Sequence, residues 1–214
     1  MSNKTLNTLF LQYSQNNYPF GGILIYNIQK EKTNIGEIFK FEIKSPMSFS
    51  NALRRIMISE VPTYAIENVY VYENTSSMYD ELLAHRLGLI PIRGKPVSND
   101  EIITFVLSKE GPCTVYSGDL TSEVGEVVFK NIPIVKLKEG QKINLECEAL
   151  VNIGKTHAKW QPCNCVYRQI DGDRVEFLVE SHGNMNSEDL LITSIEILRN
   201  KAEKFLEELE SFKI

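Results

Sequence analysis

The most regular hydrophobic pattern in the chain lies close to its C-terminal end. Apolar side chains there follow alternating steps of four and three residues, at Leu191, Ile195, Leu198, Ala202, Phe205, Leu209 and Phe212. This 3.5-residue repeat predicts a helix that begins at Asn186 or Ser187 and ends near Phe212. Because one small sheet hardly covers so long an apolar face, we expect part of that face to contact another chain.

A second amphipathic pattern begins after Pro46, and Ser48 is placed to cap a helix there. Its apolar positions recur at helical spacing: Phe49, Leu53, Ile56 and Met57. Its polar face carries three donor side chains: Asn51, Arg54 and Arg55. We therefore expect a short helix with one buried face and one cationic face that is suited to binding a carboxylate.

Alternation of apolar and polar residues predicts β-strands over most of the remaining chain. The expected strands are residues 22–29, 35–43, 64–72, 102–107, 114–117, 124–129, 134–137, 143–151 and 175–180. Residues 78–87 return to helical spacing, and Gly88 is placed as a left-handed cap of that helix. Residues 1–20 show no period, so we expect a loosely attached leader there.

These elements predict an α+β protein of two intertwined units. Residues 1–61 and 170–214 form one domain, which contains strands and the long C-terminal helix. Residues 62–169 form a β-rich domain inserted into the first. The expected architecture is therefore a discontinuous domain with an insertion.

Composition indicates a protein partner. The chain has 214 residues, of which 43% are hydrophobic, enough to bury a core, and its formal net charge of −5 disfavours a surface that grips phosphate. We expect no direct sequence-specific contact with nucleic acid. No apolar run is long enough for a membrane span, and the N-terminus lacks the pattern of a signal peptide. We therefore expect a soluble, cytoplasmic protein.

The four cysteines are irregularly spaced, at Cys113, Cys147, Cys163 and Cys165. Free thiols are the expected state because the chain has no secretion signal and no C-x-x-C pair. A small metal- or thiol-dependent enzyme that uses Cys163, Cys165 and His157 remains an alternative. Neither His85 nor His157 has a neighbour that completes a triad or a metal site, so we expect no catalytic residue, cofactor or metal. The pattern leaves Trp160 open between an interface anchor and core packing.

Two segments resemble a known family. SNALRRIMISEVPTYAIENVYVYENTSSMYDELLAHRLGLIPI, at residues 50–92, is similar to the signature of the assembly subunit of multisubunit RNA polymerases. That family includes bacterial alpha, the archaeal D-type subunit and the third-largest eukaryotic subunit. GKTHAKWQP, at residues 154–162, resembles a motif of the archaeal and eukaryotic branch that bacterial members lack. The archaeal D-type branch is therefore the expected relationship.

The resemblance implies a non-catalytic platform on which a DNA-dependent RNA polymerase assembles. It implies heterodimerisation with a small homologous subunit of the L type, binding of the second-largest catalytic subunit, and docking of small subunits of the N and P types. A free-standing homodimeric adaptor remains the other alternative. Relatives often carry a cysteine-rich insertion near residues 108–113, and this chain has no clustered ligands there.

The resemblance also indicates which residues serve each contact. The large-subunit interface is expected at Asn51, Arg54, Arg55, His85, Arg86, His157, Lys159 and Trp160. Dimerisation is expected at Phe49, Leu53, Leu191, Ile195, Leu198, Ala202, Phe205, Leu209 and Phe212.

Overall fold

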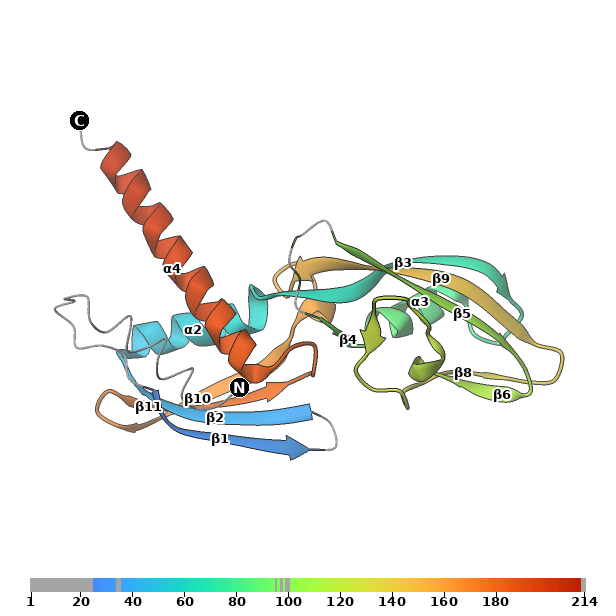
Figure 1. Ribbon diagram of the computed structural model, residues 1–214, viewed down its shortest axis with the longest axis horizontal. Helices are drawn as coiled ribbons and strands as arrows, with labels where there is room; N and C mark the ends of the chain where they lie inside the picture. The colour runs from blue at the N-terminus through green and yellow to red at the C-terminus, as the bar shows by residue number, and fades with distance from the viewer. Residues whose placement is uncertain (1–24, 34–35, 95, 97, 99–100, 213–214) are drawn as a thin grey trace.

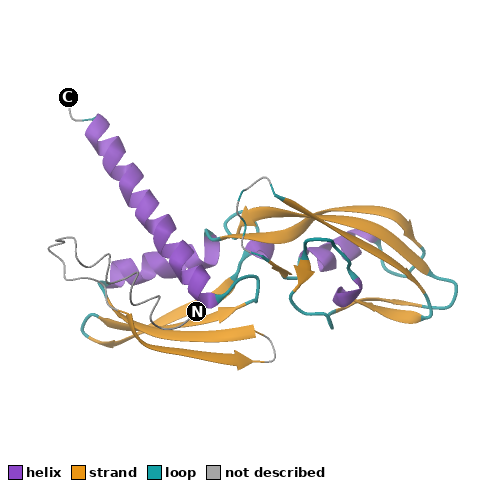
Figure 2. Cartoon of the chain, in the orientation of Figure 1, coloured by secondary structure: helices purple, strands orange, loops and turns teal. Residues whose placement is uncertain are grey.

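The described part of the chain folds around two main sheets, each with its own hydrophobic core (Figure 1). The computed structural model describes residues 25–33, 36–94, 96, 98 and 101–212. The expected leader at 1–20 and the start of the first expected strand lie outside the described residues. The α+β class, with a long C-terminal helix and an inserted β-rich region, is confirmed (Figure 2).

The first sheet, sheet A, has the strand order β1-β2-β11-β10 and is antiparallel throughout. Its strands are β1 (Ile25–Thr33), β2 (Gly36–Lys44), β10 (Cys163–Asp171) and β11 (Arg174–Ser181). Alternate residues of β2 and β11 point into the core, and Phe41 lies opposite Phe177 with ring centroids 5.0 Å apart. The apolar residues at alternate positions of the sequence therefore form the buried face of this sheet.

Two helices lie on one face of sheet A, α2 (Met47–Ser59) and α4 (Ser187–Ser211) (Figure 1). From α2, Leu53 and Met57 enter the core, and from α4, Leu190 and Leu191 do so. The helices also contact each other, and Lys201 Nζ lies 2.5 Å from a Glu60 carboxylate oxygen. Only the first turns of α4 are buried, so the rest of this 25-residue helix extends beyond the sheet.

The second sheet, sheet B, has the strand order β3-β9-β5, formed by β3 (Pro62–Asn74), β9 (Lys142–Ile153) and β5 (Ile102–Glu110). One face packs on α3 (Asp80–Gly88) and on two small two-stranded sheets, and these elements share one core. The small sheets pair β4 (Ile92–Arg93) with β7 (Glu126–Val127), and β6 (Cys113–Tyr116) with β8 (Pro133–Leu137). Short 3-10 turns occur at η1 (Ser117–Asp119) and η2 (Ala158–Trp160).

Polar contacts fix the two units against each other. The side-chain amide of Asn184, in the loop before α4, donates to the carbonyl of Ile92 at 3.1 Å. The amide of Gly94 donates to the carbonyl of Asn184 at 2.9 Å. On the other side of the junction, the amide of Lys155 donates to the carbonyl of Ser59 at 2.8 Å, beside the end of α2. The junction is therefore held by contacts between segments far apart in the chain and not by the chain crossings alone.

The structure corrects the expected boundary between the domains at residues 169 and 170. That boundary falls within β10, which pairs with β11 along its length and belongs to sheet A. Cys163 and Cys165 point into the core of sheet A, next to Met57. Their alternate spacing therefore marks the buried face of a strand, and sheet A takes up residues that the sequence analysis gave to the insertion.

Three local expectations are also corrected. Ser48 is not the cap of α2, since it lies inside the helix and the N-cap position is Pro46, without a side-chain hydrogen bond. Gly88 is the last residue of α3, and its φ is not positive. A Cβ at Gly88 would stand 3.3 Å from the carbonyl oxygen of Ile66, so glycine permits close packing of α3 on β3. The strand expected at 124–129 is reduced to Glu126–Val127.

Candidate protein-protein interface

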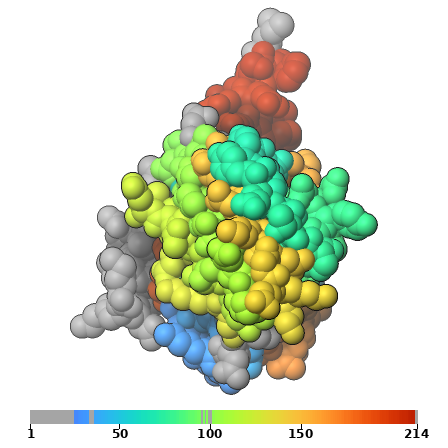
Figure 3. All heavy atoms as spheres, turned by 90° about the vertical axis from the view of Figure 1, so that its right-hand side faces the viewer, coloured from blue at the N-terminus to red at the C-terminus, as the bar shows by residue number. Residues whose placement is uncertain are grey.

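The distal half of α4 presents its apolar seam to solvent. On α4 the predicted dimerisation residues divide along the helix axis: Leu191 is buried in the chain's own core, and Ile195 and Leu198 are partly buried. On α2, Leu53 is buried and Phe49 is partly buried. The exposed members are Ala202, Phe205, Leu209 and Phe212, joined by Leu206. Phe205 is 61% exposed and Phe212 is 81% exposed. Figure 3 shows this part of α4, in red, rising above the rest of the molecule.

Contiguous apolar surface of this kind is unfavourable in water. Association with another apolar surface would remove it from solvent. The exposed side chains keep the 3.5-residue spacing of the buried ones, so they form one stripe and not scattered contacts. Among the described residues, no segment covers this stripe. Its geometry fits a second helix laid along it.

The cationic face of α2 is formed as predicted by three side chains of the helix. Nη2 of Arg54 donates to the Asn51 side-chain oxygen at 3.1 Å, and Arg54 is half-buried. Arg55 is exposed, and its carbonyl accepts a hydrogen bond from the Ser59 hydroxyl at 2.7 Å. Within the described part of the chain, no carboxylate forms an ion pair with either arginine. Arg55 is therefore available to a carboxylate from outside the chain.

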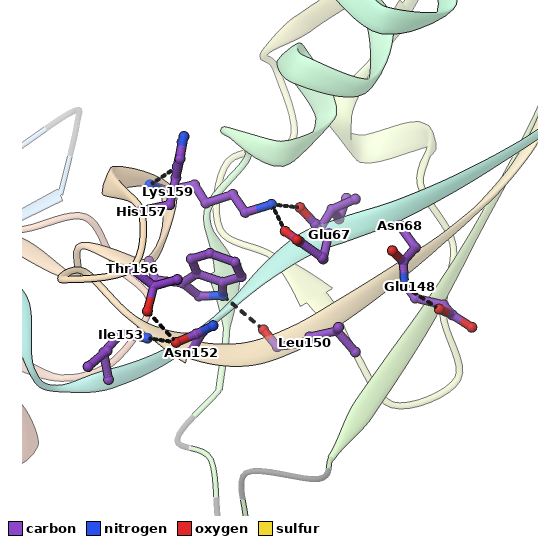
Figure 4. Close-up of polar contacts among 11 residues, drawn as sticks. Glu67, Asn68, Glu148, Leu150, Asn152, Ile153, Thr156, His157 and Lys159 are labelled. Atoms are coloured by element: carbon purple, nitrogen blue, oxygen red, sulfur yellow. Dashed lines mark hydrogen bonds and ion pairs between the residues drawn. The ribbon is translucent and has the colours of Figure 1, made fainter.

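The segment around η2 is folded inward, against β3 and β9 (Figure 4). Nζ of Lys159 pairs with the Glu67 carboxylate, donates to the carbonyl of Ile66 at 2.9 Å and lies 4.5 Å from the centroid of the Trp160 ring. The Nδ1 atom of His157 accepts a hydrogen bond from the amide of Lys159 at 3.1 Å. These contacts satisfy the Lys159 ammonium within the chain. Of the three predicted interface residues in this segment, His157 is the exposed one.

Trp160 packs in the interior and is only 3% exposed. Its indole N–H donates to the carbonyl of Leu150 at 3.0 Å, and its own carbonyl accepts from the Thr63 hydroxyl at 2.7 Å. Of the two roles that the sequence left open, core packing is the one found. Trp160 therefore fixes the segment η2 against β3 and β9.

His85 and Arg86 lie side by side on the exposed side of α3. Nη2 of Arg86 donates to the carbonyl of Pro133 at 2.5 Å, so its guanidinium is tied to β8. The end of α3 approaches η2, since a Cβ at Gly88 would stand 3.7 Å from Cδ of Lys159. The C-terminal end of α3 therefore lies beside Lys159, while the Arg86 side chain reaches to β8.

Three of the four thiols are buried and free. Burial raises the pKa of Cys147 and of Cys165 to about 12, and it raises the pKa of Cys163 as well. A thiol with such a pKa stays protonated near neutrality and is a poor nucleophile. Among the described residues, no group of three or more His, Cys, Asp or Glu side chains is arranged to hold a metal ion.

One surface was missed in the sequence analysis, the solvent-facing side of sheet B. Tyr70 and Tyr72 on β3 hydrogen bond across the strands to Glu148 and Glu146 on β9. Alternation predicted both strands. Residues two apart on a strand lie on the same face, which holds for Tyr70 and Tyr72 and for Glu146 and Glu148. What it did not indicate is that β3 and β9 are neighbours, because their pairing spans most of the inserted unit.

Comparison with known proteins identifies the class to which this fold and its surfaces belong. The family model described as "RNA polymerase Rpb3/RpoA insert domain" matches residues 69–167, which cover most of the sheet B unit. None of the described helices is long and apolar enough to cross a membrane. The class is that of the Rpb3/RpoA-type subunits of RNA polymerase.

Curated relatives narrow this assignment. The chain is 68% identical over 182 residues to DNA-directed RNA polymerase subunit Rpo3 of Methanocaldococcus jannaschii, which covers 85% of this chain and 95% of the relative. It is 43% identical over 159 residues to the Rpo3 subunit of Pyrococcus furiosus, covering 69% of this chain and 59% of the relative. For the Rpo3 subunit of Pyrobaculum aerophilum the identity is 46% over 140 residues, covering 57% of this chain and 54% of the relative.

This chain belongs to the archaeal Rpo3 family of DNA-directed RNA polymerase subunits. It is therefore a subunit of an enzyme complex, acts in transcription and has other polymerase subunits as partners.

Proposed function

We propose that this chain is the non-catalytic assembly platform of its polymerase, without an active site of its own. In this role it pairs through α4 with a small homologous subunit of the L type and docks the second-largest catalytic subunit through the polar face of α2. Small subunits of the N and P types complete the assembly. Any effect on RNA synthesis is then exerted at a distance, through the placement of other subunits.

The exposed apolar stripe on α4 is the observation that carries this proposal. Phe205, Leu206, Leu209 and Phe212 are all exposed, on a helix whose first turns are anchored in the core. Burying a side chain of this kind contributes roughly 1.5–3 kcal/mol before ordering costs. Four such residues are enough to stabilise a helix-helix contact, and leaving them in water would favour aggregation.

The available arginine of α2 supports the second contact. Arg55 is exposed and unpaired within the described residues, whereas the opposite face of the same helix is fixed in the core through Leu53 and Met57. A guanidinium on a rigid helix suits bidentate binding of a carboxylate on a partner. We expect this carboxylate on the second-largest subunit.

Phe205→Asp, in the middle of the exposed stripe, tests the proposal. The variant places a charge where the partner helix should pack, so the charge must be buried unpaired or the contact must break. We expect the affinity for the small homologous subunit to fall by at least a hundredfold in a co-purification or calorimetric assay. Asn200→Asp adds the same charge to an exposed position off the stripe and is expected to leave pairing unchanged.

Two outcomes would contradict the proposal. If Phe205→Asp paired with unaltered affinity, α4 would not be the assembly surface. If the unmodified chain did not bind the small subunit and formed only a stable dimer with itself, the chain would be a homodimeric adaptor.

A further inference from the structure

The outer face of sheet B is an exposed surface that neither of these contacts uses. Its opposite face packs on α3 and the small sheets, and the outer face looks away from them (Figure 1). Four of the exposed large hydrophobic or aromatic residues of the chain lie on it: Tyr70, Tyr72, Ile102 and Val106. Tyr70 is 47% exposed and Tyr72 is 67% exposed. A sheet face with this content is more apolar than a solvated face requires.

Two carboxylates stand at the centre of this face, on the middle strand β9. Glu148 accepts hydrogen bonds from the Asn68 amide at 2.9 Å and from the Tyr70 hydroxyl at 3.2 Å. Glu146 accepts one from the Tyr72 hydroxyl at 3.1 Å. These contacts raise the pKa of both phenols, so the tyrosines remain neutral donors that hold the carboxylates in place.

The charge of the face is not balanced within the chain. Among the described residues, no lysine or arginine forms an ion pair with Glu146 or Glu148, although both are only partly exposed. On the neighbouring strand β3, by contrast, Glu67 is paired with Lys159. Oriented carboxylates between exposed tyrosine rings match a guanidinium, which can pair with the carboxylates and stack on a ring. The same charge repels nucleic acid phosphate.

We propose that the outer face of sheet B docks an arginine-bearing segment of another polymerase subunit. The apolar side chains Ile102 and Val106 flank the carboxylates on β5, opposite the tyrosines on β3, so the segment lies across all three strands. Apolar contacts then surround the charged pair and exclude water from it, which is the arrangement that makes such a pair favourable. That the partner is a polymerase subunit rests on the proposed function.

The test uses the full chain in a reconstituted polymerase. Hydroxyl-radical footprinting with mass spectrometry measures the oxidation of Tyr70 and Tyr72 in the free chain and in the assembled enzyme. In parallel, the double variant Glu146→Gln/Glu148→Gln removes both charges but keeps acceptors for the tyrosines and Asn68. A tagged chain is immobilised, and the salt concentration that releases each subunit is recorded. The control is Glu139→Gln/Glu180→Gln, which changes the net charge equally at two exposed positions elsewhere.

We expect both tyrosines to be protected in the assembled enzyme. We also expect one subunit, other than the partner of α4, to be released from the double variant at a clearly lower salt concentration than from the unmodified chain, and to be released from the control at the unmodified concentration. The inference is overturned if the tyrosines are equally reactive in both states, or if every subunit is retained alike. Protection that requires added nucleic acid, or that arises in the concentrated free chain, would also overturn it.

The same experiment separates this inference from the proposed function. Failure of the unmodified chain to hold the small homologous subunit counts against the assembly role. Normal pairing of that subunit together with unprotected tyrosines counts against the sheet B contact alone.

Discussion

Arg55 and Trp160 show how exposure decides whether a predicted interface residue can contact a partner. Both belong to motifs that were expected to contact large subunits. Arg55 is exposed on the rigid helix α2, while Trp160 is buried and hydrogen bonded inside the chain. A residue contacts a partner directly only if its side chain reaches the surface. Trp160 instead stabilises the packing of η2 on β3 and β9.

Arg55→Ala should weaken binding of the second-largest subunit without unfolding the chain. The guanidinium contributes no ion pair within the described residues, so the free energy of unfolding should change by no more than about 0.5 kcal/mol. Loss of a desolvated, charge-assisted contact should cost the interface on the order of 2 to 5 kcal/mol. Reconstitution from purified subunits measures the second effect and thermal unfolding the first.

Lys136→Ala is the matched control, since Lys136 is an exposed cation on β8 in the other unit. Unchanged capture of the large subunit by Arg55→Ala would remove this arginine from the interface.

At the scale of single elements, α4 combines two functions along one helix. Leu190 and Leu191 are buried in the core of sheet A, whereas every residue from Arg199 to Phe212 is exposed. The same 3.5-residue repeat runs through both parts. The helix therefore carries its seam from the chain's own core outward to a surface that only another chain can cover.

Truncation of the chain after Asn200 should separate these two functions. The described residues that are removed are all exposed, and Lys201 forms a half-exposed ion pair with Glu60 at the end of α2. Such a pair contributes about 0.2 to 1 kcal/mol, so circular dichroism should show a similar melting temperature. Pairing with the small homologous subunit should be lost. A truncated chain that melts far below the full one would mean that the distal turns stabilise the core.

The whole molecule is a pair of units whose relative placement is fixed by polar contacts at the junction. Asn184 bonds to β4, and the amide of Lys155 bonds to the carbonyl of Ser59 at the end of α2, so sheet A and sheet B keep a defined geometry. The stripe on α4, the cationic face of α2 and the outer face of sheet B are thereby presented on one rigid body. A platform of this kind can order several partners because each meets a surface already in place.

The chain made alone should self-associate because the α4 stripe has no partner. In sedimentation experiments, its apparent mass should rise with concentration, and addition of the small homologous subunit should give a one-to-one complex of constant mass. Phe205→Asp should suppress the self-association. A free chain that stays monomeric over the whole concentration range would show that the stripe is stable in water.

Much of the fold is encoded in local periodicity. The spacing of Phe49, Leu53 and Met57 placed α2 and its buried face, and the repeat from Leu191 onward placed α4. Alternation placed the long strands β3, β9 and β11 close to their observed ends. These features are predictable because the helical and strand periods decide which side chains share a face.

The short strand β7 and the ends of α2 and α3 were less predictable. Glu126–Val127 pairs with only two residues of β4, so no period could develop there. α2 begins directly after Pro46, and Ser48 does not cap it. At this end of the helix the Ser45 and Ser50 hydroxyls hydrogen bond to each other. Local signals at element ends are weak compared with packing.

The sequence by itself determined the family, the α+β class and the amphipathic character of α2 and α4. Only the tertiary structure decided which turns of α4 are covered, that Trp160 lies inside, that β10 belongs to sheet A, and that Tyr70 and Tyr72 face Glu148 and Glu146. The physical reason is that periodicity fixes the direction of a side chain relative to its own element. What that side chain meets depends on contacts between segments far apart in the chain.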